Sequence, residues 1–125
     1  CGFTPTPEHP KLAKTALGAE RAVGWTHDPD GLRRARWLSE RGHRLWAVEG
    51  GERAEDLYSV DPGPPEGAPI VLVMGHEVSG VDPRILDCCE RVVRIPMAGV
   101  KGSLNVAVAF GVAAYHLRFG GRPVP

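Results

Sequence analysis

The chain has 125 residues, and its 15 basic and 15 acidic side chains give a formal net charge of zero. This length allows one domain at most, and the balanced charge excludes a general attraction to nucleic acid, so any such contact needs a local patch. The sequence contains neither a run of about 18 apolar residues, as a membrane span requires, nor a signal-peptide pattern. Its three cysteines have no disulfide or zinc spacing, and we expect no metal site and a cytoplasmic location.

The first quarter of the chain is predicted to be mostly loop. Cys1–Phe3 has the character of the end of a strand whose start is missing. Thr4–Pro10 is predicted as a loop, because its three prolines prevent regular backbone pairing. The Ala-rich stretch Lys11–Arg21 favours a short helix.

A helix and a strand are predicted next. Asp28 followed by Pro29 is typical of a helix N-cap with proline in the first helical position. Gly42 is the expected end of this helix. Arg44–Val48 then predicts a short strand, and Glu49–Asp56 a polar loop.

The second half of the chain alternates apolar strands with helices. The predicted elements are a loop at Asp61–Pro69, a strand at Ile70–Met74, a helix from Asp82 to Cys89, a strand at Val92–Ile95 and an apolar helix at Leu104–Leu117. This alternation predicts an α/β fold with a parallel sheet flanked by helices. The last helix is apolar on nearly every side, so it must be buried on more than one face.

Three polar, glycine-containing loops follow or precede these elements. They are V-L-V-M-G-H-E-V-S-G-V from Val71, R-I-P-M-A-G from Arg94 and K-G-S-L-N-V-A-V-A from Lys101. Parallel α/β sheets bind ligands at the carboxyl ends of their strands. We therefore expect a ligand site here, although the dinucleotide-binding fingerprint is absent.

Each polar or glycine residue in these loops also has a purely structural interpretation. Gly75 and Gly80 fit either a close ligand or a tight turn. Glu77 fits either a substrate-orienting carboxylate or a solvated loop acid. Ser103 is predicted to cap the last helix and Asn105 to lie in its first turn, while both also suit a polar ligand contact.

The order and spacing of the loops are more specific than any single residue. V-x-G-x-E-x-x-G, I-P-M and S-L-N-V-x-x-A resemble signature motifs of the SpoU/TrmH branch of the SPOUT RNA methyltransferases. The upstream string T-P-T-P-E-H-P-K-L-A-K-T-A-L-G-A-E is similar to small bacterial members. The resemblance implies a C-terminal trefoil knot, S-adenosylmethionine as cofactor, and methyl transfer to a ribose 2′-hydroxyl of tRNA or rRNA.

The resemblance also implies roles for individual residues. Backbone groups that hold the cofactor are implied at Val48, Gly75, Ile95, Ser103 and Leu104, and the implied catalytic residues are Glu77, Ser103 and Asn105. The chain departs from common family choices with His76 and Ala107. With Gly75 beside the cofactor, a Gly75→Val substitution is expected to block its approach.

One family motif, N-x-G-x-x-x-R with its catalytic arginine, does not occur in the sequence. We therefore expect a single domain over residues 1–125 that lacks an N-terminal strand and helix, and slow transfer by this chain alone. The alternatives are a non-catalytic, knotted dimeric module that binds S-adenosylmethionine or RNA, and an unknotted nucleotide-binding domain.

The resemblance favours a homodimer through the helix Leu104–Leu117 and tRNA ahead of rRNA as partner. Candidate RNA contacts are basic residues of the first half, namely Lys11, Lys14, Arg21, Arg33, Arg34 and Arg36, for which a solvated surface is the alternative.

Overall fold

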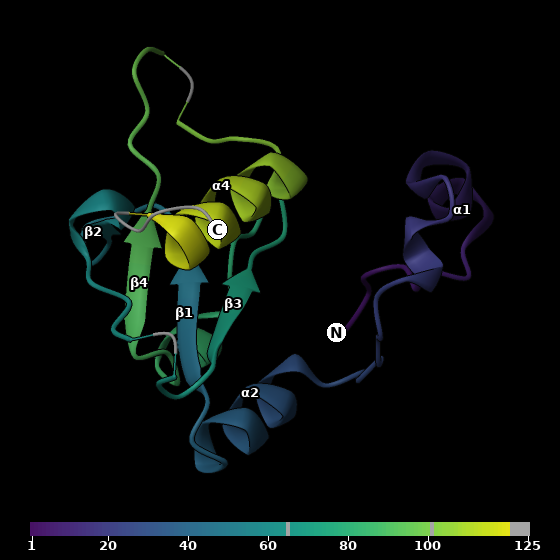
Figure 1. Ribbon diagram of the computed structural model, residues 1–125, viewed down its shortest axis with the longest axis horizontal. Coiled ribbons are helices and arrows are strands. Elements are labelled where there is room, and N and C mark those ends of the chain that lie inside the picture. Colours follow the sequence, from purple (N-terminus) through teal and green to yellow (C-terminus); the bar gives the residue numbers. More distant parts are fainter. Residues whose placement is uncertain (65, 101, 121–125) are drawn as a thin grey trace. The chain divides into compact units, whose positions relative to one another are not determined.

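The computed structural model describes residues 1–64, 66–100 and 102–120 (Figure 1). Pro65 in the predicted loop, Lys101 at the start of the third motif and residues 121–125 lie outside the described residues. Internal contacts divide the chain into two compact units, Cys1–Arg34 and Ala35–Pro125. The prediction of a single domain stays a prediction, and each unit is described by itself.

The first unit contains a short helix and a single 3₁₀ turn. Helix α1 spans Pro10–Ala16 and the turn η1 spans Ala19–Arg21. The prediction of one helix over Lys11–Arg21 was therefore too long, because Leu17 and Gly18 adopt left-handed backbone conformations that break it. Cys1–Phe3 forms a turn, so the predicted strand is wrong for these residues.

Helix α2 spans Gly31–Glu40 and begins later than predicted. The carboxylate of Asp30 accepts a hydrogen bond from the amide of Arg33 at 3.0 Å, which makes Asp30 the N-cap in place of Asp28. Asp28 instead accepts bonds from the Asp30 amide and the Arg33 guanidinium, and both lower its pKa. The helix ends before Gly42, whose φ of 78° confirms the predicted stop.

The second unit is built on a four-stranded sheet in which every described pairing is parallel. Its strands are β1 (Arg44–Val48), β2 (Glu55–Asp56), β3 (Ile70–Met74) and β4 (Arg91–Arg94), in the order β2-β4-β1-β3. β1 and β3 have the predicted bounds, while β4 is shifted by one residue from Val92–Ile95. The two-residue β2 lies inside the predicted loop Glu49–Asp56 and was missed.

The same unit contains the 3₁₀ turn η2 (Leu57–Ser59) and the helices α3 and α4. The predicted cap of α3 (Pro83–Leu86) is confirmed, because Asp82 accepts a hydrogen bond from the amide of Arg84 at 2.9 Å, but this helix ends before Cys89. Helix α4 (Val106–Phe119) packs against β1 and β3 (Figure 1). A parallel sheet flanked by helices is therefore confirmed.

The hydrophobic core lies between the sheet and α4. Trp46, Leu57, Val93 and Ala113 are each fully buried there. Other residues of α4 do not share this burial, since Val108, Phe110 and Tyr115 are each at least half exposed. The expectation that this helix is covered on more than one face is not met by the residues that the structure describes. No helix of the described ranges is both long and apolar enough to cross a membrane.

Candidate functional site

Three of the predicted site residues lie at neighbouring strand ends. Val48 is the last residue of β1, Gly75 follows β3, and Ile95 follows β4. β1 lies between β3 and β4, and all three strands run in the same direction. The structure therefore places Val48, Gly75 and Ile95 along one edge of the sheet, which we call the carboxyl edge.

Glu49 links the strand ends at this edge. Its amide donates a hydrogen bond of 3.0 Å to the carbonyl of Val93, which continues the β1–β4 pairing by one residue. Its carboxylate Oε2 accepts a bond of 2.9 Å from the amide of Val81, beyond the end of β3. The side chain is partly buried, as expected for a carboxylate that has an amide donor.

The loop after β3 is closed by its own backbone. His76 and Gly80 exchange two hydrogen bonds of 3.0 and 2.8 Å, so residues 76–80 form a tight reversal. Gly80 has a φ of 69°, a conformation that favours glycine. The ring Nδ1 of His76 accepts a bond from the Val78 amide at 3.2 Å, which gives this histidine a structural role.

The packing of this loop explains why position 75 is glycine. A Cβ at Gly75 would lie 2.6 Å from the carbonyl carbon of Gly80 and 2.7 Å from the amide nitrogen of Val81. Both are backbone atoms and cannot swing away. The expectation that Gly75→Val acts by blocking a ligand is therefore corrected, because the substitution collides first with the protein itself.

Two of the predicted catalytic side chains are open to solvent. The Glu77 side chain is 66% exposed, and its carboxylate lies 3.9 Å from Nε2 of His76. Ser103 is exposed in the connection between β4 and α4. Neither side chain belongs to the core, so their polar groups are accessible from solvent.

Asn105 and not Ser103 caps helix α4. The Asn105 side-chain oxygen accepts a hydrogen bond of 2.9 Å from the amide of Ala107. The predicted cap at Ser103 is wrong because the helix begins at Val106, two residues later than predicted. Leu104 is exposed and lies next to the cap. The predicted residues 103–105 therefore form the entry to α4.

The candidate RNA-binding residues are divided between the two units. Lys11 and Lys14 are exposed on α1, while Arg21 lies 3.8 Å from Glu20. Arg33 is bound to Asp28 at 2.7 Å. Arg34 and Arg36 also belong to α2, where Arg34 is half-buried and Arg36 exposed. Contact of these residues with RNA stays a prediction.

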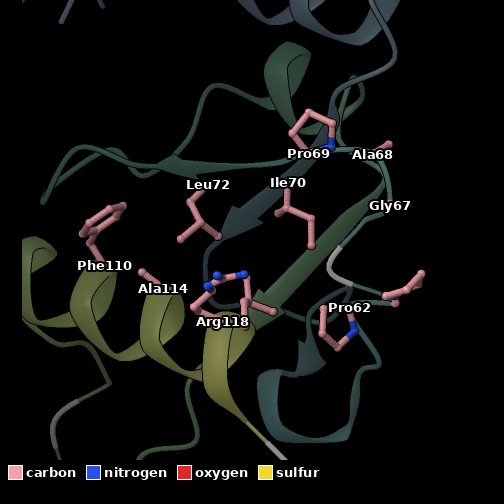
Figure 2. Close-up of a pocket in the computed structure, with 12 residues that line it drawn as sticks. Pro62, Gly67, Ala68, Pro69, Ile70, Leu72, Phe110, Ala114 and Arg118 are labelled. Carbon is pink, nitrogen blue, oxygen red and sulfur yellow. The ribbon is translucent and has the colours of Figure 1, made fainter. Parts of the chain in front are cut away.

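A hollow of about 370 Å³ lies away from the carboxyl edge. Figure 2 shows it between β3 and α4, where Ile70 and Leu72 face Phe110 and Ala114. The loop before β3 closes its other side. Its lining mixes apolar side chains with polar groups such as Arg118 and includes none of the predicted site residues, so it does not mark the predicted site.

Glu49 was predicted only as the first residue of a polar loop, and its contact with the loop after β3 was missed. A weak signal was present, because a carboxylate that directly follows a strand of buried residues has an amide partner when it is itself partly buried. The partner itself, Val81, is 32 residues further along the chain. Its identity depends on the pairing of β1 with β3, which a local pattern does not contain.

Comparison with known proteins identifies the family. The model of the SpoU rRNA Methylase family matches residues 3–115. The 23S rRNA (guanosine-2'-O-)-methyltransferase RlmB of Ralstonia nicotianae is 39% identical over 105 residues, which are 83% of this chain and 40% of that protein. RlmB of Vibrio parahaemolyticus is 33% identical over 110 residues, with 87% of this chain and 42% of that protein covered.

Solved structures agree with the sequence comparison. The AdoMet-bound rRNA methyltransferase from Sinorhizobium meliloti has a TM-score of 0.83 at 26% identity, covering 94% of this chain and 43% of that one. The A. aeolicus TrmH/SpoU tRNA modifying enzyme has a TM-score of 0.76 at 27% identity, covering 86% and 53%. The chain spans about two fifths of the length of the curated relatives named above. With most of its residues matched by the family model, the chain belongs to the SpoU rRNA methylase family.

Proposed function

We propose that this protein takes part in methyl transfer from S-adenosylmethionine to a ribose 2′-hydroxyl of RNA. The observation that carries the proposal is the meeting of Val48, Gly75 and Ile95 at one edge of a parallel sheet. Ligands of open α/β folds bind at this edge. The names of the matched relatives support the same activity, since they are described as guanosine-2'-O-methyltransferases of 23S rRNA.

The residues at the carboxyl edge fit this cofactor. Val48 and Ile95 are half-buried apolar side chains that pack against the core, which suits the apolar wall of a site for an adenine ring. Added Cβ atoms at Gly50, Gly99 and Gly102 would meet nothing within 4 Å, so the backbone there is open. We propose that backbone groups at Val48, Gly75, Ile95, Ser103 and Leu104 hold the cofactor.

The exposed polar side chains are suited to orienting the RNA. When bound, S-adenosylmethionine supplies a methyl group activated by its sulfonium, and the ribose hydroxyl loses a proton as it accepts that methyl group. We propose that Glu77 and Ser103 orient the ribose through hydrogen bonds, which contributes to the rate by positioning. Asn105 holds the start of α4, so its proposed catalytic role includes fixing the position of Ser103.

We place rRNA ahead of tRNA as the substrate class. The curated relatives are named for 23S rRNA, so the tRNA preference inferred from the sequence is not supported by them. The tRNA alternative keeps some support, since a structure concerning 2-OH methylation of C/U34 on tRNA is 32% identical with a TM-score of 0.70, covering 90% of this chain and 70% of that one.

The trefoil knot and the homodimer are also part of the proposal. The exposed apolar side chains of α4, namely Val108, Phe110 and Tyr115, support a partner that covers this helix. A second copy of the chain is the proposed partner, because most oligomers of soluble proteins are symmetric pairs. Light scattering at tens of micromolar tests this, and a monomer there contradicts the dimer.

Calorimetry and a transfer assay together test the proposed activity. We expect S-adenosylmethionine to bind with a Kd of micromolar order, which corresponds to about 8 kcal/mol. The transfer assay follows tritium from labelled S-adenosylmethionine into 23S rRNA and, separately, into tRNA. Transfer into neither RNA, with binding intact, favours the non-catalytic cofactor-binding module. Absence of binding contradicts the cofactor assignment.

A further inference from the structure

Glu49 has a position that its place in the sequence does not reveal. It extends β1 by one residue, and its backbone amide bonds to β4 through the Val93 carbonyl at 3.0 Å. Its carboxylate extends toward the loop after β3 and accepts a hydrogen bond of 2.9 Å from the Val81 amide. The ends of β1 and β4 and the end of the loop after β3 are therefore joined through one residue.

The carboxylate also fits tightly against the loop that it holds. A Cβ built on Gly80 would lie 2.7 Å from Oε2 and 3.1 Å from Cδ of Glu49. On the other side, Gly75 leaves no room for a Cβ beside Gly80 and Val81. The loop is thus packed between the end of β3 and the Glu49 carboxylate. Backbone packing requires glycine at position 75, whereas at Gly80 the φ of 69° favours glycine.

The chemistry of the contact makes glutamate suitable at this position. A carboxylate accepts hydrogen bonds only, and its charge strengthens a bond from a backbone amide. Aspartate is one methylene shorter and does not reach Val81 without movement of the backbone. Glutamine keeps both the length and an acceptor oxygen, although it loses the charge. The hydrogen bond to Val81 therefore depends on both the length and the charge of the side chain at position 49. Substitutions that change only one of these properties can separate the two effects.

We infer that Glu49 is a positioning residue that anchors the loop 75–81 to the end of β1 and thereby sets the shape of the carboxyl edge. The loop itself is closed by the two hydrogen bonds between His76 and Gly80, and Glu49 fixes its position through the Val81 amide. Because Gly75 and Glu77 belong to the same loop, we expect release of Val81 to shift both of them relative to Val48. The link to the cofactor rests on the proposed function, whereas the anchoring of the loop does not.

The test compares Glu49→Ala, Glu49→Asp and Glu49→Gln in the same chain. Calorimetry with S-adenosylmethionine gives the affinity, and amide hydrogen exchange at Val81 reports the loop. We expect the Ala and Asp variants to bind roughly tenfold more weakly or worse, as expected for loss of a hydrogen bond to a charged group, with faster exchange at Val81. The Gln variant should keep Val81 protected and bind within about threefold of the parent, because its oxygen still accepts the bond.

Two control variants separate positioning from general stability. Glu52→Ala removes an exposed acid from the loop after β1, which also contains Glu49. Glu90→Gln weakens the ion pair with Arg44 at the opposite ends of the strands. Neither should change cofactor affinity, even if the second lowers the unfolding temperature. An equal loss of affinity in Glu90→Gln would overturn the inference, since loss of stability would then explain the effect.

The outcomes also distinguish this inference from the proposed function. If the parent binds S-adenosylmethionine and Glu49→Ala binds it equally well, the inference fails while the function stands. If Gln is as damaging as Ala, the carboxylate acts through its charge and the positioning role is wrong. If the parent does not bind, the cofactor assignment fails. Amide hydrogen exchange at Val81 then decides by itself whether Glu49 anchors the loop.

Discussion

The two ends of the parallel sheet use polar groups in opposite ways. At the start of β1 and β4, charged side chains pair with each other. Arg44 makes two bonds of 2.8 Å to Glu90, and Arg91 binds Glu55 at 2.9 Å. Both guanidinium groups also lie over Trp46, at 5.4 and 5.5 Å from the ring centre.

At the carboxyl edge the backbone is held internally and polar side chains face solvent. Glu49 anchors the loop after β3, and Glu77 within that loop is exposed. Ser103 is exposed in the segment that leads into α4. The amino ends of the strands thus carry stabilising ion pairs, whereas the carboxyl edge is where the ligand site is proposed. Substitutions at the amino ends should affect unfolding, and substitutions of exposed groups at the carboxyl edge should affect ligands and transfer.

The largest expected effect is on catalysis. Glu77→Gln and Ser103→Ala should each lower methyl transfer into RNA by about 10²-fold, if these groups orient or assist the reacting hydroxyl. The free energy of unfolding should change by less than about 0.5 kcal/mol, because both side chains are exposed. Tritium transfer and urea unfolding are measured on the same preparations. Unchanged transfer in both variants would remove these residues from the mechanism.

Backbone crowding at the carboxyl edge gives the next effect. Gly75→Ala should lower the free energy of unfolding by about 1–3 kcal/mol, since its methyl group meets the backbone of Gly80 and Val81. Gly50→Ala is the matched control, because a Cβ there has nothing within 4 Å. Equal free energies of unfolding for the two variants in urea would show that the loop after β3 accommodates the added methyl group without loss of stability.

The cap of α4 gives a smaller effect on stability. Asn105→Ala should cost about 1 kcal/mol, because the amide of Ala107 loses its acceptor. Ser103→Ala, two residues earlier, serves as the control and should leave the unfolding temperature unchanged. A larger loss in Ser103→Ala than in Asn105→Ala would restore Ser103 as the cap.

The smallest effect concerns the amino ends of the strands and depends on pH. The hydrogen bond from Arg44 lowers the pKa of Glu90 below its ordinary value of 4.5. A lowered folded-state pKa stabilises the protein above that ordinary value, and this contribution is lost as the pH falls through the folded-state pKa. Glu90→Gln should therefore cost less than about 1 kcal/mol at pH 7, because the pair is partly exposed.

Denaturant unfolding of parent and Glu90→Gln from pH 7 down to pH 3 measures this dependence. The difference between them should shrink as the pH falls below 4.5. A difference that is constant over this range would mean that the charge of Glu90 does not contribute. Cofactor affinity at pH 7 should be the same in both proteins, as the separation of the two edges requires.

Sequence patterns predicted the elements whose signals are local. β1 and β3 have the predicted bounds because each is an apolar run between polar or proline-containing stretches. The start of α2 was misplaced because Asp28 and Asp30 are both good caps, and a turn at Asp28 delays the helix. β2 was missed because Glu55 and Asp56 have low strand propensity and pair only through β4.

The candidate site divides in the same way. The family resemblance implied Val48, Gly75 and Ile95, and the structure places these three residues at the carboxyl ends of neighbouring strands, while their contact with a cofactor stays a prediction. The roles of Glu49 and Gly80 depend on a contact between the ends of β1 and β3, which the linear sequence does not specify. Gly75, which was interpreted as leaving space for a ligand, is required because a Cβ there would collide with the backbone of Gly80 and Val81.

The parallel arrangement of the strands also has a consequence for how the protein folds. Arg44 in β1 pairs with Ile70, and Trp46 pairs with Arg91, so each ladder joins distant parts of the chain. Such pairings require large loops to close before any contact compensates for the lost chain entropy. Folding should therefore be slow compared with a helical protein of this size, since rates fall as contacts become less local. During synthesis, we expect β1 to stay unpaired until its partners β3 and β4 have left the ribosome.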